Sequence, residues 1–539
     1  MTTEWWREAV FYEIYVRSFQ DSNGDGVGDL AGIIQRLDYL NDGTPASLGI
    51  DAIWLTPINP SPMFDCGYDV SDYRDVDPVF GSLADLDQLL VEAHRRDIRV
   101  IMDLVPNHTS HLHAWFQASR RSHHDPQRDW YIWRDPRPDG GPPNNWVSAF
   151  GGPAWTFDQT TGQYYLHSFL AEQPDLNYCN PEVARAMEDT IRFWLDRGVD
   201  GFRVDVIHKL MKDAALRDNP PPPADAEHPL KHYFGQEHRY DDDQPEVHAL
   251  LRTWRRLLDA YGGRTMVGEV YLFDLERVAA YHGNGDDELP LAFNFGFLWS
   301  PWSAAAFREQ VDRMQALLPP AAQPTYVLSS HDAPRYRTRF DDPVWGTQRA
   351  RVAAMMLLTL RGTPFLYYGE EIGMADGVVP VERICDPVGK RFPALNRDPE
   401  RTPMQWNAAP NAGFTTAADS WLPVGSDFAT LNVAEQFDDP RSHLSFYRRL
   451  IWFRKRATAL RRGSYRPVDG PADTFVFWRE SAEQRLLVAL NFASEPRAIE
   501  LQGVRNARVE ISTDCDRASG PLEGGALQLG PVEGVIVSL

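Results

Sequence analysis

The chain has 539 residues, of which 43% are hydrophobic and 24% are charged. Because a single hydrophobic core stops growing near about 250–300 residues, this length predicts more than one domain. Lys and Arg total 54 against 76 Asp and Glu, and the resulting net charge of −22 argues against nucleic acids and anionic membranes as partners.

The first residues and the cysteines indicate a soluble, cytoplasmic protein. Residues 1–7 lack the basic-then-apolar layout of a signal peptide, and no apolar run approaches the ~20 residues that cross a bilayer. The cysteines lack the CxxC spacing of a zinc site and do not suggest a disulfide framework; they are Cys66, Cys179, Cys385 and Cys515.

Apolar, β-rich runs alternate with helix-period segments over most of the chain, which predicts βαβ units and a parallel sheet. Helical segments are expected at 83–95 and 181–197, among others. Eight strands with helical crossovers make a (β/α)8 (TIM) barrel. The eight predicted strands are 10–15, 52–55, 100–104, 201–204, 265–267, 292–295, 326–328 and 364–368.

Two departures from the βα pattern predict two further domains. Residues 107–172 are too long for a βα loop and rich in Trp, Pro and Gly, so we expect a small inserted domain after the third strand. Residues 463–539 change to short alternating strands, which predicts an antiparallel β-sandwich. The barrel would then comprise 1–106 and 173–462, with a long proline-rich loop at 218–243 over the same face as the inserted domain.

The loop after the first strand carries oxygen-bearing side chains at alternate positions. Asp21, Asn23, Asp25 and Asp29 follow this spacing, with Gly26 available for the turn, as at the start of an EF-hand calcium loop. The twelfth position is glycine rather than glutamate, so the full EF-hand pattern is absent. The loop is therefore either a cation site or a solvated acidic turn.

Several carboxylates directly follow predicted strands. Asp205, Glu269 and Asp332 do so, and Val105 to His108 end an apolar run in the same way. In a β/α barrel the active site lies at the C-terminal ends of the strands. Splitting a glycosidic bond requires one ionised and one protonated carboxyl group on either side of the acetal. The pattern indicates a glycoside-processing enzyme.

The neighbours of these carboxylates suggest their roles. Arg203 faces the same side of its strand as Asp205, and a fixed cation there would keep a nucleophile ionised. A helix cap is the structural alternative for Asp205. Nearby carboxylates would raise the pKa of Glu269, as a general acid requires. His331 and Asp332 together can donate to and accept from sugar hydroxyls.

Six blocks of the sequence resemble the α-amylase family, glycoside hydrolase family 13, and within it the α-glucosidase and oligo-1,6-glucosidase branch. Ser330 departs from the asparagine usual before the His-Asp pair, and residues 41–46 are an insertion. Neither departure touches a catalytic carboxylate. The blocks, in family order, are Asp103-Leu-Val-Pro-Asn-His108, Gln173-Pro-Asp-Leu-Asn177, Gly201-Phe-Arg-Val-Asp205, Gly268-Glu269, Ser330-His-Asp332 and Arg401-Thr-Pro-Met-Gln-Trp406.

The resemblance implies a retaining, two-step displacement. Asp205 would attack the anomeric carbon, while Glu269 would protonate the leaving oxygen and then activate water or another acceptor. Asp332 would bind hydroxyls of the glucose and favour its distorted transition state. Three further residues are implied as transition-state donors: Arg203, His108 and His331.

The resemblance also implies a pocket that closes around one glucose. By itself Asp65-Cys-Gly-Tyr68 is a turn sequence. In relatives of this kind the aspartate grips the non-reducing end and the tyrosine stacks on the ring. An Asp65–Arg401 pair would block further sugar sites and restrict the enzyme to chain ends. Phe150 and Phe169 would either close the rim or only pack within the inserted domain.

The remaining implications concern linkage and metal. Val206, next to the nucleophile, would favour α-1,6 bonds over α-1,4 bonds, or it merely extends the buried strand. A structural calcium or magnesium ion would be held in the Asp21–Asp29 loop, with the backbone carbonyl of Val27 as an added ligand. No catalytic cofactor is implied.

We interpret the chain as a retaining, exo-acting α-glucosidase that releases or transfers single glucose units from short α-glucosides with α-1,4 or α-1,6 linkages. The expected partner is this small sugar substrate, and the protein would be a monomer or a homo-oligomer. A glucosyltransferase or isomerase acting on sucrose, trehalose or maltose remains an alternative. A non-catalytic binding homologue is disfavoured because all three carboxylates are present.

Overall fold

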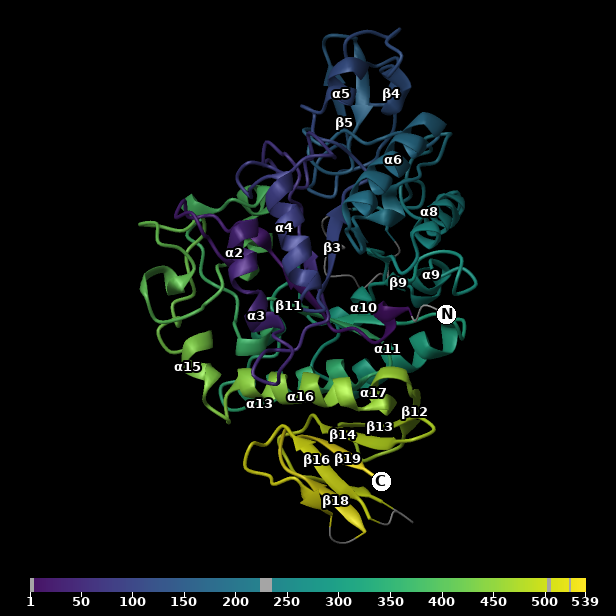
Figure 1. Ribbon diagram of the computed structural model, residues 1–539. Coiled ribbons are helices and arrows are strands. Elements are labelled where there is room, and N and C mark those ends of the chain that lie inside the picture. Colours follow the sequence, from purple (N-terminus) through teal and green to yellow (C-terminus); the bar gives the residue numbers. More distant parts are fainter. Residues whose placement is uncertain (1–3, 223–234, 502–505, 523–524) are drawn as a thin grey trace.

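The computed structural model describes residues 4–222, 235–501, 506–522 and 525–539. It contains the predicted eight-stranded parallel barrel (Figure 1), in the order β10-β11-β1-β2-β3-β7-β8-β9. A parallel bridge between Phe293 and Thr325 brings the two edge strands together. The strands are β1 (Phe11–Ile14), β2 (Ala52–Leu55), β3 (Arg99–Leu104), β7 (Gly201–Val204), β8 (Thr265–Gly268), β9 (Leu291–Ala292), β10 (Thr325–Val327) and β11 (Thr363–Tyr367).

Helices cover the outside of the barrel, and several of them begin at residues whose side chains cap the first turn. Ser82 and Asp85 form a capping box at the start of α4 (Leu83–His94). Asn180 caps α6 (Pro181–Arg197), which has proline in its first turn and ends at the left-handed Gly198. The other long helices are α8 (Val247–Tyr261), α11 (Ala304–Leu317), α13 (Gly346–Thr359) and α16 (His443–Arg456).

Shorter helices connect these elements. The α-helical ones are α1 (Val16–Phe19), α2 (Leu30–Gln35), α3 (Leu37–Leu40), α5 (Ala114–Ser119), α9 (Leu275–Ala280), α10 (Phe295–Leu298), α12 (Tyr336–Arg339), α14 (Pro387–Arg391), α15 (Val433–Phe437) and α17 (Thr458–Arg462). Single 3-10 turns include η3 (Ile207–Lys209), η4 (Glu370–Ile372) and η7 (Asp398–Arg401).

One predicted strand is shorter than expected. The sequence suggested 292–295, but β9 ends at Ala292 and α10 begins at Phe295. Asn294 is the reason, because its side chain accepts a hydrogen bond from the amide of Phe297 and caps the helix. Phe293 and Phe295 are apolar residues two positions apart, a spacing that is also typical of a strand, so the sequence alone predicted a longer one.

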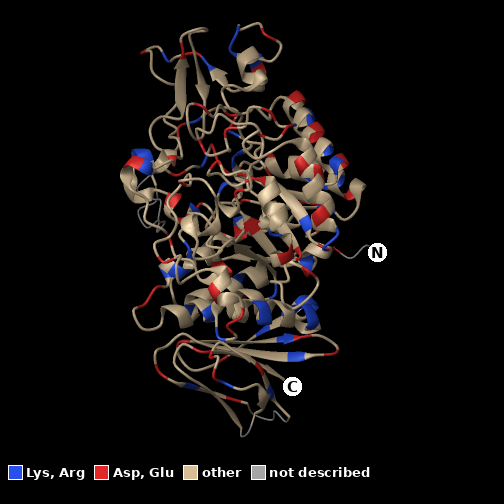
Figure 2. Cartoon of the chain, turned by 60° about the vertical axis from the view of Figure 1, so that its left-hand side comes forward, with Lys and Arg blue, Asp and Glu red and all other residues tan. Residues whose placement is uncertain are grey.

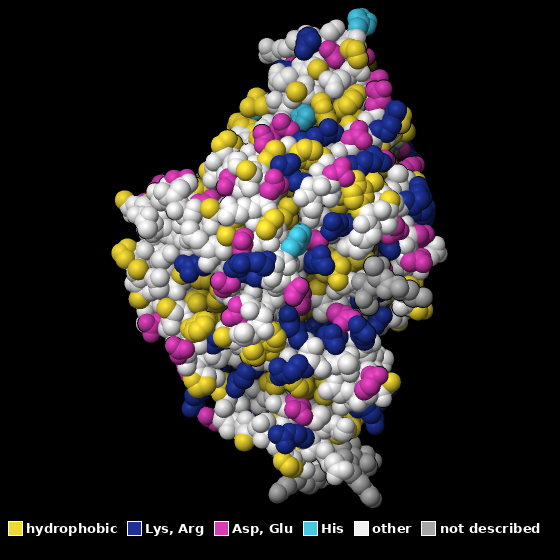
Figure 3. All heavy atoms as spheres, in the orientation of Figure 1, with side chains coloured by type: hydrophobic (Ala, Val, Ile, Leu, Met, Phe, Trp, Pro, Cys, Tyr) yellow, Lys and Arg dark blue, Asp and Glu magenta, His cyan; other side chains and the backbone are white. Residues whose placement is uncertain are grey.

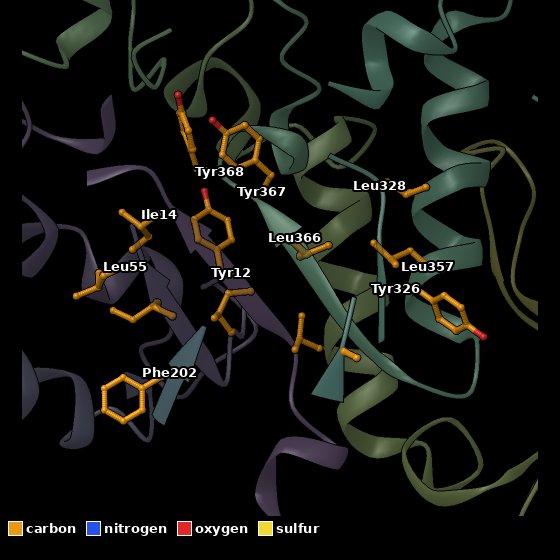
Figure 4. Close-up of a cluster of buried hydrophobic side chains, with 14 of the residues drawn as sticks. Tyr12, Ile14, Leu55, Phe202, Tyr326, Leu328, Leu357, Leu366, Tyr367 and Tyr368 are labelled. Carbon is orange, nitrogen blue, oxygen red and sulfur yellow. The ribbon is translucent and has the colours of Figure 1, made fainter. Parts of the chain in front are cut away.

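Side chains along the barrel strands alternate between two cores. Phe11, Trp54 and Phe365 point into the barrel and pack together. Tyr12 and Leu366 point outwards into the larger core between the strands and the helices (Figure 4). This alternation places the next inward position of each strand at the barrel mouth, above the apolar interior.

The inserted segment contains a three-stranded antiparallel sheet at the barrel mouth, at the top of Figure 1. Its strands are β4 (Trp133–Arg134), β5 (Trp155–Asp158) and β6 (Gln163–Leu166). The predicted loop at 218–243 lies partly outside the described residues, which omit 223–234.

The C-terminal segment forms two antiparallel sheets at the opposite end of the molecule (Figure 1). Apolar residues including Trp478 and Leu527 form their shared core. In the described part of the chain, no helix is long and apolar enough to cross a membrane. The strands are β12 (Ser464–Val468), β13 (Thr474–Glu480), β14 (Arg485–Asn491), β15 (Arg497–Glu500), β16 (Arg508–Ser512), β17 (Gly520–Pro521), β18 (Ala526–Leu529) and β19 (Gly534–Ser538).

Candidate active site

A buried guanidinium lies at the centre of the barrel mouth. Arg203, the inward-facing residue near the end of β7, donates from Nη1 to Asp103 and to Asp205, at 2.7 Å in each case. Its Nη2 lies 2.6 Å from Oε2 of Glu269. One cation therefore contacts both predicted catalytic carboxylates.

The side chains of Asp205 and Glu269 lie close together, because both carboxylates bind the same Arg203 guanidinium. Such proximity fits the retaining arrangement, in which the two carboxyl groups stand about 5–5.5 Å apart, better than the inverting spacing of about 6.5–9.5 Å. Burial raises the pKa of Asp205 well above its usual value; Arg203 opposes this rise and the charge of Glu269 adds to it.

This finding corrects the expectation that Arg203 would hold Asp205 ionised. In the substrate-free site, burial outweighs the cation. Two carboxyl groups so close together resist ionising at the same time, which acts in the same direction as burial on the pKa of Asp205.

Asp332 is held in the opposite state. It accepts hydrogen bonds from Arg397 at 2.9 Å and Arg401 at 2.6 Å, and His331 Nε2 lies 3.1 Å away. Burial alone would raise the pKa of Asp332, but His331 and Arg397 lead the groups that lower it well below its usual value. The carboxylate is therefore held in its ionised form by cationic neighbours.

His331 is part of the same charged cluster. Its Nδ1 lies 2.6 Å from the buried Glu13, and its Nε2 is 2.7 Å from the hydroxyl of Tyr68. Burial acts to lower the pKa of His331, but Asp332 and Glu13 outweigh it and raise the pKa to about 9. His331 is therefore cationic at neutral pH, which suits a donor to the substrate.

The wall of the pocket differs from the predicted Asp65–Arg401 pair. Arg397 forms that contact instead, with Nη2 3.1 Å from Asp65 and 2.7 Å from Asp386. Arg401 donates to the backbone carbonyl of His331 at 2.7 Å as well as to Asp332. Arg397 thus joins Asp65 to Asp332. It lies in an irregular segment four residues before the recognised block, so strand alternation could not place it.

The inserted domain contributes a second group of predicted residues. His108 Nε2 lies 3.1 Å from Nε2 of Gln173, which donates to Asp65 at 3.0 Å. Burial lowers the pKa of His108 to about 4, so the ring is neutral. Phe169 packs against His108 and Phe150 with ring centroids 5.1 and 5.3 Å apart.

The rim continues from these rings to the barrel loops. The Arg397 guanidinium lies 5.1 Å from the centroid of the Phe150 ring, and Arg391 donates to the Phe150 carbonyl at 3.2 Å. Phe150 and Phe169 therefore lie beside the pocket wall rather than only within the inserted domain.

Val206 has an unusual backbone conformation. Its φ of 35° and ψ of 46° are left-handed, which is rare and costly for a β-branched residue. In this conformation its amide donates to Oε2 of Glu269 at 2.9 Å. The side chain is 8% exposed, so little of it is accessible.

Two inward-facing acids were not predicted as site residues. Glu13 of β1 contacts His331, and Asp103 of β3 binds Arg203, Trp54 and Tyr68. Both follow the same alternation that placed Arg203. Buried acids on otherwise apolar strands were the available signal for both residues.

A buried lysine connects the inserted domain to the barrel. The Lys212 ammonium lies 3.0 Å from Asp175 and 3.0 Å from Asn107 Oδ1, and it also donates to the carbonyl of Lys209. Asn107 in turn contacts His108, at 3.2 Å. The ammonium thus supports the segment that carries His108.

The acidic loop has the predicted residues on one turn. Asp21 is 5% and Asp29 4% exposed, and both accept hydrogen bonds from amides of the loop or of the helix that follows. Asp25 accepts from the amide of Val27 at 2.8 Å, and Asn23 from that of Asp25 at 2.9 Å. Among the described residues, the loop carboxylates do not form a group of three within 4.8 Å. Asn23 and a carbonyl oxygen would have to complete any cation site.

In a different group of potential metal ligands, the ligand atoms do lie within 4.8 Å of one another. It consists of His238, Asp241 and Asp242, within the described residues. The Lys209 ammonium already lies 2.5 Å from Asp242. A lysine cation in this position neutralises the carboxylate and competes with a metal ion.

Comparisons with known proteins agree with this geometry. The family description "Alpha amylase, catalytic domain" matches residues 13–463. The oligo-1,6-glucosidase of Heyndrickxia coagulans is 40% identical over 529 residues, covering 91% of this chain and 92% of that protein.

Solved structures extend the similarity to the whole fold. The alpha-glucosyl transfer enzyme XgtA superposes with a TM-score of 0.92 and 43% identity, with all of both chains covered. Trehalulose synthase MutB from Pseudomonas mesoacidophila MX-45 gives a TM-score of 0.88 and 36% identity over 99% of each chain. MutB has also been solved with its substrate sucrose.

Proposed function

The chain belongs to the α-amylase family, and from that premise we propose that it is a retaining, exo-acting α-glucosidase. It releases or transfers single glucose units from the non-reducing end of short α-glucosides. Curated relatives over most of its length include oligo-1,6-glucosidases and α-glucosidases, which supports this substrate class.

The observation that carries exo action is the cluster of ion pairs around Arg397. Arg397 binds Asp65, Asp332 and Asp386 together, so a sugar beside Asp332 meets an ion-pair wall. A pocket blocked on that side accepts only the last residue of a chain. An endo-acting enzyme would need that side open.

The geometry supports two chemical steps. Asp205 attacks the anomeric carbon while Glu269, acting as the general acid, passes its proton to the leaving oxygen, so the glycosidic bond breaks as the glucosyl–Asp205 ester forms. Glu269, now a carboxylate, then takes a proton from the incoming water or sugar, whose oxygen displaces Asp205 and restores the α-configuration.

Transfer to a sugar is the second candidate function, and two structural neighbours favour it. XgtA is described as an alpha-glucosyl transfer enzyme and MutB as a trehalulose synthase. Both reaction types share the glucosyl intermediate proposed here. A non-catalytic role is disfavoured because Asp205, Glu269 and Asp332 are in place.

Product analysis separates hydrolysis from transfer. Maltose, isomaltose, sucrose and trehalose would each be incubated with the enzyme at low and high concentration. We expect glucose as the only monosaccharide cleaved from α-1,6 and α-1,4 glucobioses, with longer or isomerised products increasing at high concentration. Internal cleavage of a longer oligosaccharide would contradict exo action.

We also propose a structural calcium or magnesium ion in the loop formed by Asp21, Asn23, Asp25, Val27 and Asp29. An ion bound only by the folded chain would raise thermal stability by mass action. Addition of EDTA should lower Tm while initial rates at low temperature stay constant. An unchanged Tm, also after prolonged dialysis, would contradict the site.

A further inference from the structure

A groove lies at the end of the barrel away from the inserted domain, where α16 runs beside the C-terminal sheets (Figure 1). It has a cavity volume of about 650 Å³. The insertion at 41–46 forms one wall through Pro45 and Ala46, and Glu510 and Ile511 of β16 form another. The floor is one face of α16, whose residues recur at intervals of three and four: Ser445, Arg448, Arg449, Trp452, Phe453 and Arg456.

The groove is locally basic within an acidic protein. It is lined by three arginines and by two acids, Asp438 and Glu510, in a chain of net charge −22. Among the described residues, the ion pairs do not include Arg448, Arg449 or Arg456, whereas the groove acid Glu510 lies 3.9 Å from Arg508. Figure 3 shows basic side chains over the lower half of the molecule, where α16 lies, and Figure 2 shows them along the helices above the C-terminal strands.

The arginines differ in what holds them. Arg448 is anchored to the loop walls, donating to the carbonyls of Ala46, at 2.8 Å, and of Phe437. Arg449 has a weak contact with the thiol of Cys515, at 3.9 Å. Arg456 is exposed, and its side chain makes no hydrogen bond with the described residues. Arg449 and Arg456 therefore retain their donors for a ligand.

A fixed aromatic ring lies between these two arginines along the helix. The Trp452 indole donates from Nε1 to the carbonyl of Ser47 at 3.0 Å. The ring also lies against Gly49, where an added Cβ would be only 2.8 Å from Nε1, and the Lys455 ammonium is 5.1 Å from the ring centroid. Glycine at this position allows the indole to approach the backbone closely, so the ring forms a rigid part of the groove floor.

We propose that this groove binds a small phosphate ester that carries a ring. The phosphate would bind Arg449 and Arg456, because guanidinium forks match phosphate oxygens in charge and geometry. The ring would pack against Trp452. The groove volume falls within the roughly 300–1,000 Å³ typical of small-molecule sites. Nucleoside phosphates and hexose phosphates share this chemistry, and binding experiments can distinguish them.

Titration calorimetry on the full-length protein tests the proposal. Three probes would be used, namely adenosine diphosphate, glucose 6-phosphate and inorganic phosphate. We expect one of the two esters to bind and its Kd to weaken about tenfold or more in the double variant Arg449→Ala/Arg456→Ala, which loses charge-assisted hydrogen bonds. Arg121→Ala, an exposed arginine in the inserted domain, is the matched control and should bind as the wild type does.

Two accompanying measurements test whether the double variant is intact and whether the ligand ring contacts Trp452. Tm and aryl-glucoside hydrolysis should be unchanged in the double variant, because neither arginine touches the active site. Trp452→Leu should weaken the ester more than inorganic phosphate if the ring contact is real. The ester that binds more tightly identifies the source of the ligand.

Three results would overturn the proposal. The first is no detectable binding of either ester at millimolar concentration. The second is ester binding that the double variant leaves unchanged. The third is a concentration-dependent dimer, seen by light scattering, that forms in the wild type and in Arg121→Ala but not in the double variant. A second copy of the chain would then cover the groove.

Discussion

Asp205, Glu269 and Arg203 form one hydrogen-bonded unit, and their roles can be separated by substrate choice. Asp205→Asn removes the nucleophile, so turnover should be lost for every substrate while Tm stays near the wild-type value, because the barrel mouth is not its stability face. Glu269→Gln removes the acid, so natural disaccharides should fail. An aryl glucoside, whose leaving group needs no proton, should still form the glucosyl intermediate.

Stopped-flow release of the aryl alcohol measures that first step directly. A burst in Glu269→Gln, and none in Asp205→Asn, is the expected pair of results. If Asp205→Asn produced the burst instead, the two assignments would have to be exchanged.

Val206 combines a strained backbone with a side chain beside the nucleophile. We predict that Val206→Thr gains activity on maltose relative to isomaltose, because a hydroxyl replaces a methyl next to the leaving sugar. One such contact discriminates by roughly 1–3 kcal/mol, so the activity ratio should move about 10- to 200-fold at most. Threonine is also β-branched, so the left-handed strain is unchanged. An unaltered ratio would show that Val206 does not set linkage, and Val206→Ala separates crowding from the added hydroxyl.

His331 should make the fold sensitive to alkaline pH. Its pKa in the folded protein, about 9, lies above the value of about 6.5 expected in the unfolded chain. The resulting stabilisation is complete below about pH 6.5 and is lost as pH rises through about 9. Wild-type Tm should therefore fall more between pH 7 and pH 10 than that of His331→Gln. Parallel curves for the two proteins would contradict a raised pKa.

At the scale of elements, Lys212 holds the inserted domain onto the barrel. Lys212→Met would leave Asp175 buried without its cation, at a cost of about 3–5 kcal/mol for breaking a buried pair. Tm should fall clearly, and Lys212→Met/Asp175→Asn should recover much of the loss because no bare charge remains.

A surface pair provides the control for that experiment. Lys455 lies 2.7 Å from Asp51, with side chains 22% and 29% exposed. Such pairs contribute only about 0–1 kcal/mol, so Lys455→Met should change Tm little. Equal losses at the two lysines, or no recovery in the double variant, would argue against an anchoring role for Lys212.

For the whole molecule, sequence periodicity predicted the regular strands of the barrel but not the site residues that lie in irregular segments. The predicted strands at 52–55 and 201–204 match β2 and β7, because buried parallel strands show as uninterrupted apolar runs. The same alternation placed Arg203 and Asp205 on one face. The same alternation also predicts that Glu13 of β1 faces inward, and an acid at such a position is a signal for the site.

Arg397 could not be found in this way. It lies between two short turns, where no helical or strand period constrains the direction of a side chain. Its contacts to Asp65, Asp332 and Asp386 come from segments distant in sequence, so only the folded chain brings them together. The groove beside α16 was missed for the same reason, since its walls come from three separate parts of the chain.

The central claim is that Asp205 and Glu269 carry out a retaining displacement in a pocket for one glucose. Proton NMR of the first-formed glucose from an aryl α-glucoside tests it most directly, because all the glucose then comes from the cleaved unit and its two anomers give separate signals before they equilibrate. We predict that α-glucose appears first from the cleaved unit and that β-glucose grows in only by mutarotation. A β-anomer formed first from that unit would contradict the claim.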